Sequence, residues 1–241
     1  MNNIEISIIT SLFKGGDFIE GFLFDITRQS VFEKCELLII GANSPESKIE
    51  EYYIKKFQKK FKNISYSRLD DDPGIYGVWN IGVEKSQGKY LTNANLDDRK
   101  DGRNLEVMKN ELDKNPEIDL VYGEYLETHM PNESFNENSA RVKFPSLPFS
   151  IENMFKVNSP HSGPMCRRDL HDRCGMFDAS YRSAGDYEMW LRAVQQGAQF
   201  KKIDQILSLY YRNPEGISSK KEYLDSNIKE FNEIKARYAE K

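Results

Sequence analysis

The sequence predicts an α/β protein in which helices flank a mostly parallel sheet, and two observations lead to this fold class. Between residues 4 and 93, short apolar stretches typical of strands alternate with amphipathic stretches typical of helices, an order that predicts a parallel sheet covered on both faces. The 241 residues include 39% hydrophobic residues and contain no internal repeat or dividing linker. We therefore expect a single domain with a sizeable core.

The first half of the chain supplies most of this alternation. Runs rich in Ile, Leu and aromatic residues predict buried strands at residues 4–10, 35–40, 64–69 and 90–92. The helices between them are predicted at residues 17–26, 47–61 and 75–88. Asp17 and Ser47 each precede a Glu by three residues, a capping-box pattern that predicts where the first two helices begin.

Ligands of such sheets bind beyond the carboxyl ends of the strands. The predicted binding loops are therefore those that follow Thr10, Ile40, Leu69 and Asn93. The loop after Asn93 is the most informative of the four, because it is rich in polar and acidic residues.

The alternation weakens in the second half of the chain. The predicted elements there are a helix at 102–115, a strand at 120–128, a helix at 186–196, a pair of strands around Phe200 and Leu207, and a terminal amphipathic helix bearing Leu224, Ile228, Phe231 and Ile234. Residues 131–150 carry Asn, Ser and Pro without periodicity and predict a mobile loop.

Composition narrows the class of protein. With 34 basic and 38 acidic residues the formal net charge is −4, and no separate basic run indicates nucleic acid as a partner. The apolar runs are too short for a transmembrane segment, and residues 1–5 lack the pattern of a secretory signal, so we expect a cytoplasmic protein. The three cysteines include no CxxC pair and suit reduced thiols.

The predicted strand at 90–92 runs directly into Asn95, Asp97 and Asp98. Hard divalent ions take oxygen ligands and often bind one or two carboxylates together with substrate phosphates, which this segment can supply. Capping of the next helix by Asp97 and Asp98 explains the same acids, so this segment alone leaves both interpretations open.

Two further segments place acids beside predicted helices. Asp72 precedes a Pro-Gly turn after the third strand, where it suits either acceptance of a hydrogen bond from a base or a ribose hydroxyl or, more commonly, a solvated turn. Asp186 stands at the start of a helix, where it suits either a cap or, kept ionised by the helix dipole, a general base.

A structural zinc site is a further alternative. Its candidate ligands are His161, Cys166, His171 and Cys174. Their spacing fits no standard zinc finger, so ordinary core and surface positions are the favoured interpretation.

Together these segments resemble family 2 of the inverting glycosyltransferases, which have the Rossmann-like GT-A fold, over residues 4–219. Residues 72–76 resemble the D-x-G-I-Y segment of that family, residues 95–99 occupy the place of its D-x-D-D motif, and residues 185–186 occupy the place of its E-D pair. The resemblance implies a GT-A domain over 1–219, with the helix in 220–241 packed on it.

The resemblance also implies roles for individual residues. Asp97 is the implied ligand of Mn²⁺ or Mg²⁺, and Asp186 the implied catalytic base. The implied nucleotide-sugar-binding residues are Thr10, Ser11, Asp72, Tyr76, Asn80, Asn95, Leu96 and Asp98. The implied reaction moves a sugar from a nucleotide sugar, a UDP-sugar in the first instance, to a saccharide or lipid-linked hydroxyl acceptor. Surface polysaccharide or glycoconjugate synthesis, with peripheral membrane contact, fits that reaction.

Three positions depart from the family pattern. Gly41 and the residues after it replace the usual base-binding Asp, Asn95 replaces the first acid of the metal motif, and Gly185 replaces the usual Glu. Two alternative functions are a sugar nucleotidyltransferase, although residues 11–16 lack its Gly-rich, Arg-containing loop, and a nucleotide-sugar or glycan binding protein without turnover. A dinucleotide-dependent oxidoreductase is disfavoured because no G-x-G-x-x-G follows a strand.

Overall fold

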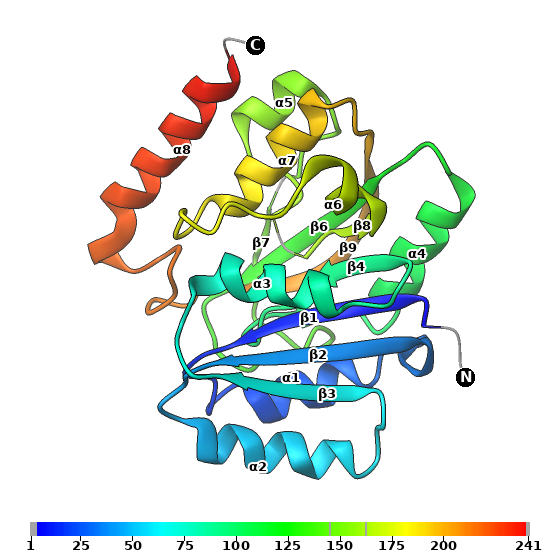
Figure 1. Ribbon diagram of the computed structural model, residues 1–241, viewed down its shortest axis with the longest axis vertical. Helices are drawn as coiled ribbons and strands as arrows, with labels where there is room; N and C mark the ends of the chain where they lie inside the picture. Colours follow the sequence, from blue (N-terminus) through cyan, green and yellow to red (C-terminus); the bar gives the residue numbers. More distant parts are fainter. Residues whose placement is uncertain (1–3, 145, 162, 240–241) are drawn as a thin grey trace.

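The computed structural model describes residues 4–144, 146–161 and 163–239 of the chain (Figure 1). The strands are β1 (Ile6–Leu12), β2 (Cys35–Ala42), β3 (Ile64–Leu69), β4 (Tyr90–Asn93), β5 (Arg99–Lys100), β6 (Leu120–Thr128), β7 (Val142–Phe144), β8 (Met165–Arg167) and β9 (Phe200–Tyr211). The α-helices are α1 (Ile19–Ile26), α2 (Ser47–Gln58), α3 (Gly74–Lys85), α4 (Asn104–Lys114), α5 (Ile151–Lys156), α6 (Asp169–Cys174), α7 (Gly185–Gln195) and α8 (Leu224–Ala239). Two 3₁₀ turns are η1 (Phe32–Lys34) and η2 (Lys221–Tyr223).

The described strands form one mixed sheet in the order β3-β2-β1-β4-β8-β6-β9-β5, with β7 also paired to β6. The strands β3, β2, β1 and β4 are parallel, as the alternating pattern predicts. The short strand β8 enters antiparallel between β4 and β6, and β6 then pairs parallel with β9. The predicted α/β class is confirmed, with helices on both faces of the sheet.

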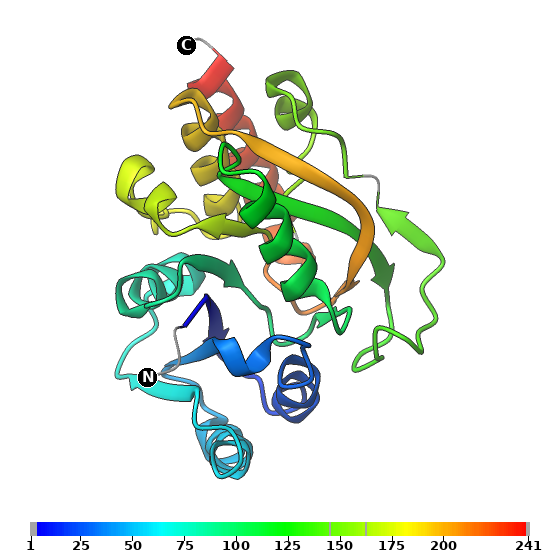
Figure 2. The same cartoon turned by 90° about the vertical axis from the view of Figure 1, so that its right-hand side faces the viewer.

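Alternate side chains of β1 point into two separate cores. Ile6, Ile8 and Leu12 pack with α1, α2 and α4 on one face, whereas Ile9 packs with α3 and α7 on the other. Figure 2 shows α1 and α3 on opposite sides of β1 and β2. Burial of each aliphatic side chain contributes about 1.5–3 kcal/mol, and the helices on both faces leave β1 and β2 buried almost throughout.

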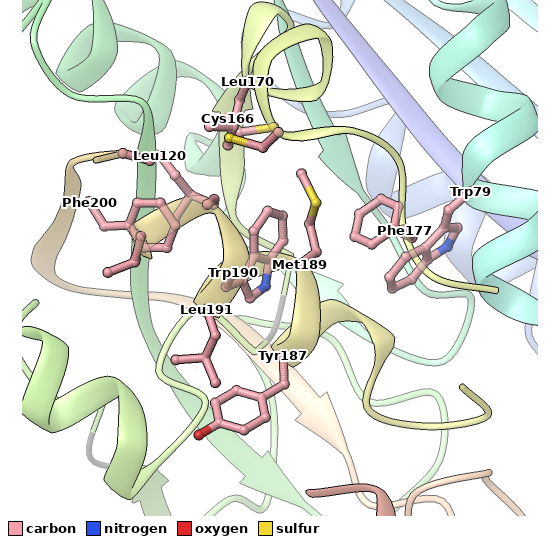
Figure 3. Close-up of a cluster of buried hydrophobic side chains, with 14 of the residues drawn as sticks. Trp79, Leu120, Cys166, Leu170, Phe177, Tyr187, Met189, Trp190, Leu191 and Phe200 are labelled. Carbon is pink, nitrogen blue, oxygen red and sulfur yellow. The ribbon is translucent and has the colours of Figure 1, made fainter. Parts of the chain in front are cut away.

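The core on the α3 side holds α7 in place. Trp190, from α7, lies between Phe177 and Phe200, with ring centroids 5.8 Å and 6.2 Å away. Figure 3 shows Trp190 and Met189 inside this cluster, with Trp79 of α3 beyond Phe177. Because these rings fix α7, they also fix Asp186 in its first turn.

Several predicted details of the elements are wrong. Neither Asp17 nor Ser47 caps a helix, since the N-cap residues are Phe18 and Glu46 and neither makes a side-chain cap. The helix predicted to reach residue 61 ends at Gln58. The predicted pair of strands near the C-terminus is the single strand β9, which stays paired with β6 across register shifts near Glu124.

The predicted loop at 131–150 contains the strand β7, which pairs with β6 at Tyr125 through Glu127. Pro145, in the middle of that loop, lies outside the described residues, as do residues 1–3 and 240–241 at the ends of the expected domain ranges. Three short elements, α5, β8 and α6, were not predicted at all, because they span only three to six residues each.

The last helix packs on α7. Phe231 stacks on Tyr187 with ring centroids 4.8 Å apart, and Ile234 and Tyr238 are buried in the same core. Leu224 and Ile228, predicted to share the apolar side, are 40% and 60% exposed, so that side of α8 is covered only in its second half.

In the part of the chain that the structure describes, no helix is both long enough and apolar enough to cross a membrane. All three cysteines are buried free thiols.

Candidate active site

The turn between β4 and β5 carries the acidic residues. The backbone N–H of Ala94 donates to the carbonyl of Ile9, which ties the start of this turn to β1. The turn ends at Arg99, where β5 pairs with Leu209 of β9. The turn is therefore held between the parallel half of the sheet and its last long strand.

Asp98 is buried, and both of its carboxylate oxygens are engaged. Oδ1 accepts a hydrogen bond of 3.0 Å from the backbone N–H of Tyr211, and Oδ2 accepts one of 3.1 Å from Asn95. Burial and the neighbouring charge of Asp97 raise the pKa of Asp98 to about 7. Asn95, which replaces an acid of the family motif, thus orients Asp98.

Asp97 lies partly exposed beside Asp98. One of its oxygens accepts a hydrogen bond of 3.3 Å from the side chain of Asn213, and burial raises the pKa of its carboxyl. The next helix, α4, begins at Asn104 with Arg103 as its N-cap and without a side-chain cap. The alternative that Asp97 and Asp98 cap this helix is therefore wrong.

The chemistry of this turn suits a hard cation. A bound cation would favour the charged forms of Asp97 and Asp98, which burial and mutual repulsion disfavour. Among the described residues, no three His, Cys, Asp or Glu side chains converge as a complete ligand set. A divalent ion here fits as one held by Asp97, supported by Asp98, with its remaining ligands from substrate phosphates and water.

Asp186 is the second residue of α7, and its carboxylate accepts two hydrogen bonds. Tyr76 of α3 donates to Oδ1 at 3.2 Å, and Asn158 donates to Oδ2 at 2.8 Å. Burial raises the pKa of Asp186, and the nearby His161 and the two hydrogen bonds oppose that rise. The N-cap of α7 is Ala184, without a side-chain cap, so the cap alternative for Asp186 is also wrong.

His161 lies in an aromatic cluster near Asp186. Its ring stacks on Tyr125 at 5.5 Å and meets Tyr210 edge-on at 5.1 Å. Burial lowers the pKa of His161, while the negative charge of Asp186 raises it. The zinc alternative does not assemble, since the described residues hold no such group of ligands and His171 faces the carbonyl of Gly175.

One cavity joins the two acidic positions. Its lining residues are Trp79, Asn93, Asn95, Asp98, Lys100, His161, Gly163, Pro164, Asp186 and Trp190. Asp98 comes from the β4–β5 turn and Asp186 from α7, 88 residues later in the sequence. The fold therefore places a carboxylate turn and a buried carboxylate on the same small space.

Not every residue implied by the family resemblance reaches this cavity. Thr10 is fully buried within β1, and Leu96 packs into the core on the α1 side. Asn80 exchanges two hydrogen bonds with the backbone of Phe177, at 2.8 Å and 2.9 Å. Asp72 is exposed and accepts a hydrogen bond from the N–H of Gly74 in its turn. Ser11, near the end of β1, is partly exposed.

Sequence reasoning did not assign three residues of this region, Asn158, Lys100 and Asn213. It named a fourth, His161, only as a candidate zinc ligand. Asn158 follows a short helix that was not predicted, and Asn213 lies beyond the last strand. Asn158 and Asn213 reach the two acids only through the tertiary fold, so their positions along the chain do not indicate a role in the site. Lys100 had a signal, since it follows the acidic turn directly.

Comparison with known proteins decides the family. The model of Glycosyl transferase family 2 matches residues 7–174. The chain belongs to glycosyl transferase family 2. An uncharacterized glycosyltransferase of Methanocaldococcus jannaschii is 25% identical over 178 residues. An uncharacterized glycosyltransferase of Haemophilus influenzae is 26% identical over 157 residues. These matches cover 73% and 65% of this chain but only 60% and 61% of the relatives, so the chain spans about three fifths of their length.

Solved structures of glycosyltransferases share the fold. TarS of S. aureus in complex with UDP-GlcNAc superposes with a TM-score of 0.77 at 15% identity, covering 97% of this chain and 66% of TarS. The mannosyltransferase PcManGT from Pyrobaculum calidifontis, in complex with GDP-Man and Mn²⁺, gives 0.67 at 12% identity, covering 89% and 59%. The GT-A type fold expected for family 2 is thereby confirmed.

Proposed function

We propose that this family 2 member is an inverting glycosyltransferase that moves a sugar from a UDP-sugar to a hydroxyl acceptor. The observation that carries the proposal is the cavity shared by Asp98 of the acidic turn and Asp186 of α7. Positive charge stabilises a departing diphosphate, and a base must take the proton of an attacking hydroxyl. The acidic turn suits the first role through a bound metal ion, and Asp186 suits the second.

In the proposed reaction, Asp186 accepts the proton of the acceptor hydroxyl while that oxygen forms a bond to the anomeric carbon of the donor. The bond from that carbon to the diphosphate oxygen breaks on the opposite side, and its electron pair leaves with the nucleoside diphosphate. One such displacement inverts the configuration of the anomeric carbon.

The surroundings of Asp186 support its role as the base. Burial raises its pKa, which makes the carboxylate a stronger proton acceptor than an exposed one. The hydrogen bonds from Tyr76 and Asn158 fix the direction of the carboxylate. Holding bound reactants in the right orientation lowers the activation barrier by about 7–11 kcal/mol in favourable cases.

Asp97 would hold the cofactor, a Mn²⁺ or Mg²⁺ ion, with Asp98 in support. When bound, this ion supplies positive charge that stabilises the departing diphosphate. The hydrogen bonds of Asp98 to Tyr211 and Asn95 keep the acidic turn rigid, so that Asp97 does not need to reorganise.

We further propose uridine as the nucleoside and a saccharide or lipid-linked hydroxyl compound as the acceptor, in surface polysaccharide or glycoconjugate synthesis. The support for uridine is the similarity to TarS, whose structures contain UDP and UDP-GlcNAc. PcManGT binds GDP-Man instead, so the nucleoside needs a direct test.

Calorimetric titration tests the proposal. UDP, GDP and CMP are titrated into the wild type, Asp97→Ala and Asp71→Ala, each with and without Mn²⁺. Asp71 is an exposed acid of the turn before α3, which makes it a matched control. We expect UDP to bind with Mn²⁺ in the wild type and in Asp71→Ala but not in Asp97→Ala. Absence of metal-dependent nucleotide binding by the wild type would refute the proposal.

A further inference from the structure

The acidic side chains of the cavity already have hydrogen-bond partners. Asp98 accepts from Tyr211 and Asn95, and Asp186 accepts from Tyr76 and Asn158. Each oxygen of the two carboxylates thus has a donor within the protein. The two carboxylates of this cavity therefore do not lack hydrogen-bond donors.

Two donors on the same cavity have no such partner. Among the described residues, the indole N–H of Trp190 is buried without a hydrogen bond, and so is Nδ1 of His161, whose role as donor or acceptor depends on the tautomer. The ammonium of Lys100 makes no hydrogen bond and no ion pair within 4.0 Å to any described residue, although Lys100 is only 7% exposed. Asp98 and Asp25 oppose the charge of this ammonium only from beyond contact distance. A buried ammonium without a contacting acceptor is unfavourable, so Lys100 is free to bind an anionic group of a ligand.

The backbone leaves room for this ammonium. A side chain at Gly163 would come within 2.7 Å of Nζ of Lys100 and within 2.9 Å of the carbonyl oxygen of Asn93. Gly163 also has a φ of +68°, in the left-handed region that favours glycine. Neighbouring Arg99 points elsewhere, since it donates to the carbonyl of Leu96 and to Asn132.

The proposed reaction assigns this space to the donor sugar. The diphosphate lies on the side of Asp97 and Asp98, and the acceptor oxygen lies beside Asp186. The anomeric carbon must lie between them, so the sugar ring occupies the cavity that Asp98, Lys100 and Asp186 line.

From these positions we infer that Lys100 selects a donor whose sugar carries a carboxylate, a nucleotide-linked hexuronate. The inference rests on the proposed function and adds the class of sugar to it. The carboxylate accepts charge-assisted hydrogen bonds from Lys100, with the N–H of Trp190 as a second donor. A neutral hexose offers hydroxyls to the same groups but leaves the ammonium without an anion in contact with it.

Binding of three ligands tests this inference without turnover. UDP, UDP-glucose and UDP-glucuronate are titrated, each with Mn²⁺, into the wild type, Lys100→Met and Lys85→Met. Methionine has a similar length without the charge, and Lys85 is an exposed lysine at the end of α3, outside the cavity. We expect the wild type and Lys85→Met to bind UDP-glucuronate at least about tenfold more tightly than UDP-glucose.

In Lys100→Met, we expect that preference to disappear while UDP affinity stays within about twofold of the wild type. Equal or weaker wild-type binding of UDP-glucuronate than of UDP-glucose would overturn the inference even if Lys100→Met did not fold. An equal loss of all three ligands in folded Lys100→Met would also overturn it, because Lys100 would then serve the diphosphate. Failure of every ligand to bind the wild type would instead refute the proposed function itself.

Discussion

The phenol of Tyr76, in α3, donates a hydrogen bond of 3.2 Å to Asp186, which lies 110 residues later in α7. A donor to a carboxylate stabilises its ionised form and lowers its pKa. The contact therefore links the packing of two helices to the protonation state of the proposed base.

Replacing Tyr76 with Phe is expected to move the pH dependence of transfer. Loss of the hydrogen bond raises the pKa of Asp186 further, so the limb on which activity rises with pH shifts to higher pH. The measurement is kcat against pH, with Tyr52→Phe on the exposed side of α2 as the control. An unshifted limb in Tyr76→Phe would show that this contact does not tune the base.

Asp186→Asn is expected to lower kcat by about a hundredfold or more, because the amide cannot accept the acceptor proton. Its affinity for UDP is expected to stay close to that of the wild type, since the proposed reaction places the diphosphate beside Asp97 and Asp98, away from Asp186. The control is Asp172→Asn, an exposed acid of α6. Near-normal turnover by Asp186→Asn would remove Asp186 from the role of base.

Glu230 of α8 is expected to stabilise the loop before α7. Its carboxylate accepts hydrogen bonds from the backbone N–H groups of Arg182, Ser183 and Ala184 and from the hydroxyl of Ser183. Glu230→Ala should lower the free energy of unfolding by about 1–3 kcal/mol. On the same helix, the one ion pair of Glu233 with a described residue is an exposed contact of 3.7 Å to Lys229, so Glu233→Ala should cost less than about 1 kcal/mol in urea unfolding. Equal losses would contradict this role.

Asp98→Asn is expected to change how stability depends on pH. The pKa of Asp98 is about 7 in the folded protein against 3.8 for an ordinary Asp, so between these values the folded state binds more protons and stability falls as pH rises. Relative to Asp98→Asn, the metal-free wild type should lose up to about 1.4 kcal/mol for each pH unit in that window. Urea unfolding in EDTA at several pH values measures the difference, with exposed Asp169→Asn as the control. Parallel curves for wild type and Asp98→Asn would exclude the shift.

The parallel half of the sheet was predictable because its strands are buried on both faces. The strands β1 and β2 are rich in Ile and Leu and buried almost throughout, and α1 between them shows one apolar side. The short elements α5, β8 and α6 depend on pairing and packing with distant residues, so their sequences lack a repeating pattern. The length of β9 was missed for a related reason, because the exposed Asp204 and Gln205 interrupt its apolar pattern.

The candidate site was predictable in part. The family resemblance pointed to Asp97, Asp98 and Asp186, and the structure places the last two on one cavity. It pointed equally to Thr10 and Leu96, whose side chains lie in the core. A motif specifies position along the chain, whereas the direction of a side chain depends on strand alternation and packing that the motif does not contain.

The hydrogen bonds from Tyr211 and Asn213 to the acidic turn also bear on synthesis at the ribosome. The β4–β5 turn emerges more than a hundred residues before these two partners, so Asp97 and Asp98 first exist as a loose pair of like charges. The turn gains its final shape only after β9 has emerged and paired with β6 and β5. A nascent chain that lacks β9 should therefore bind no donor, however completely its earlier strands have folded.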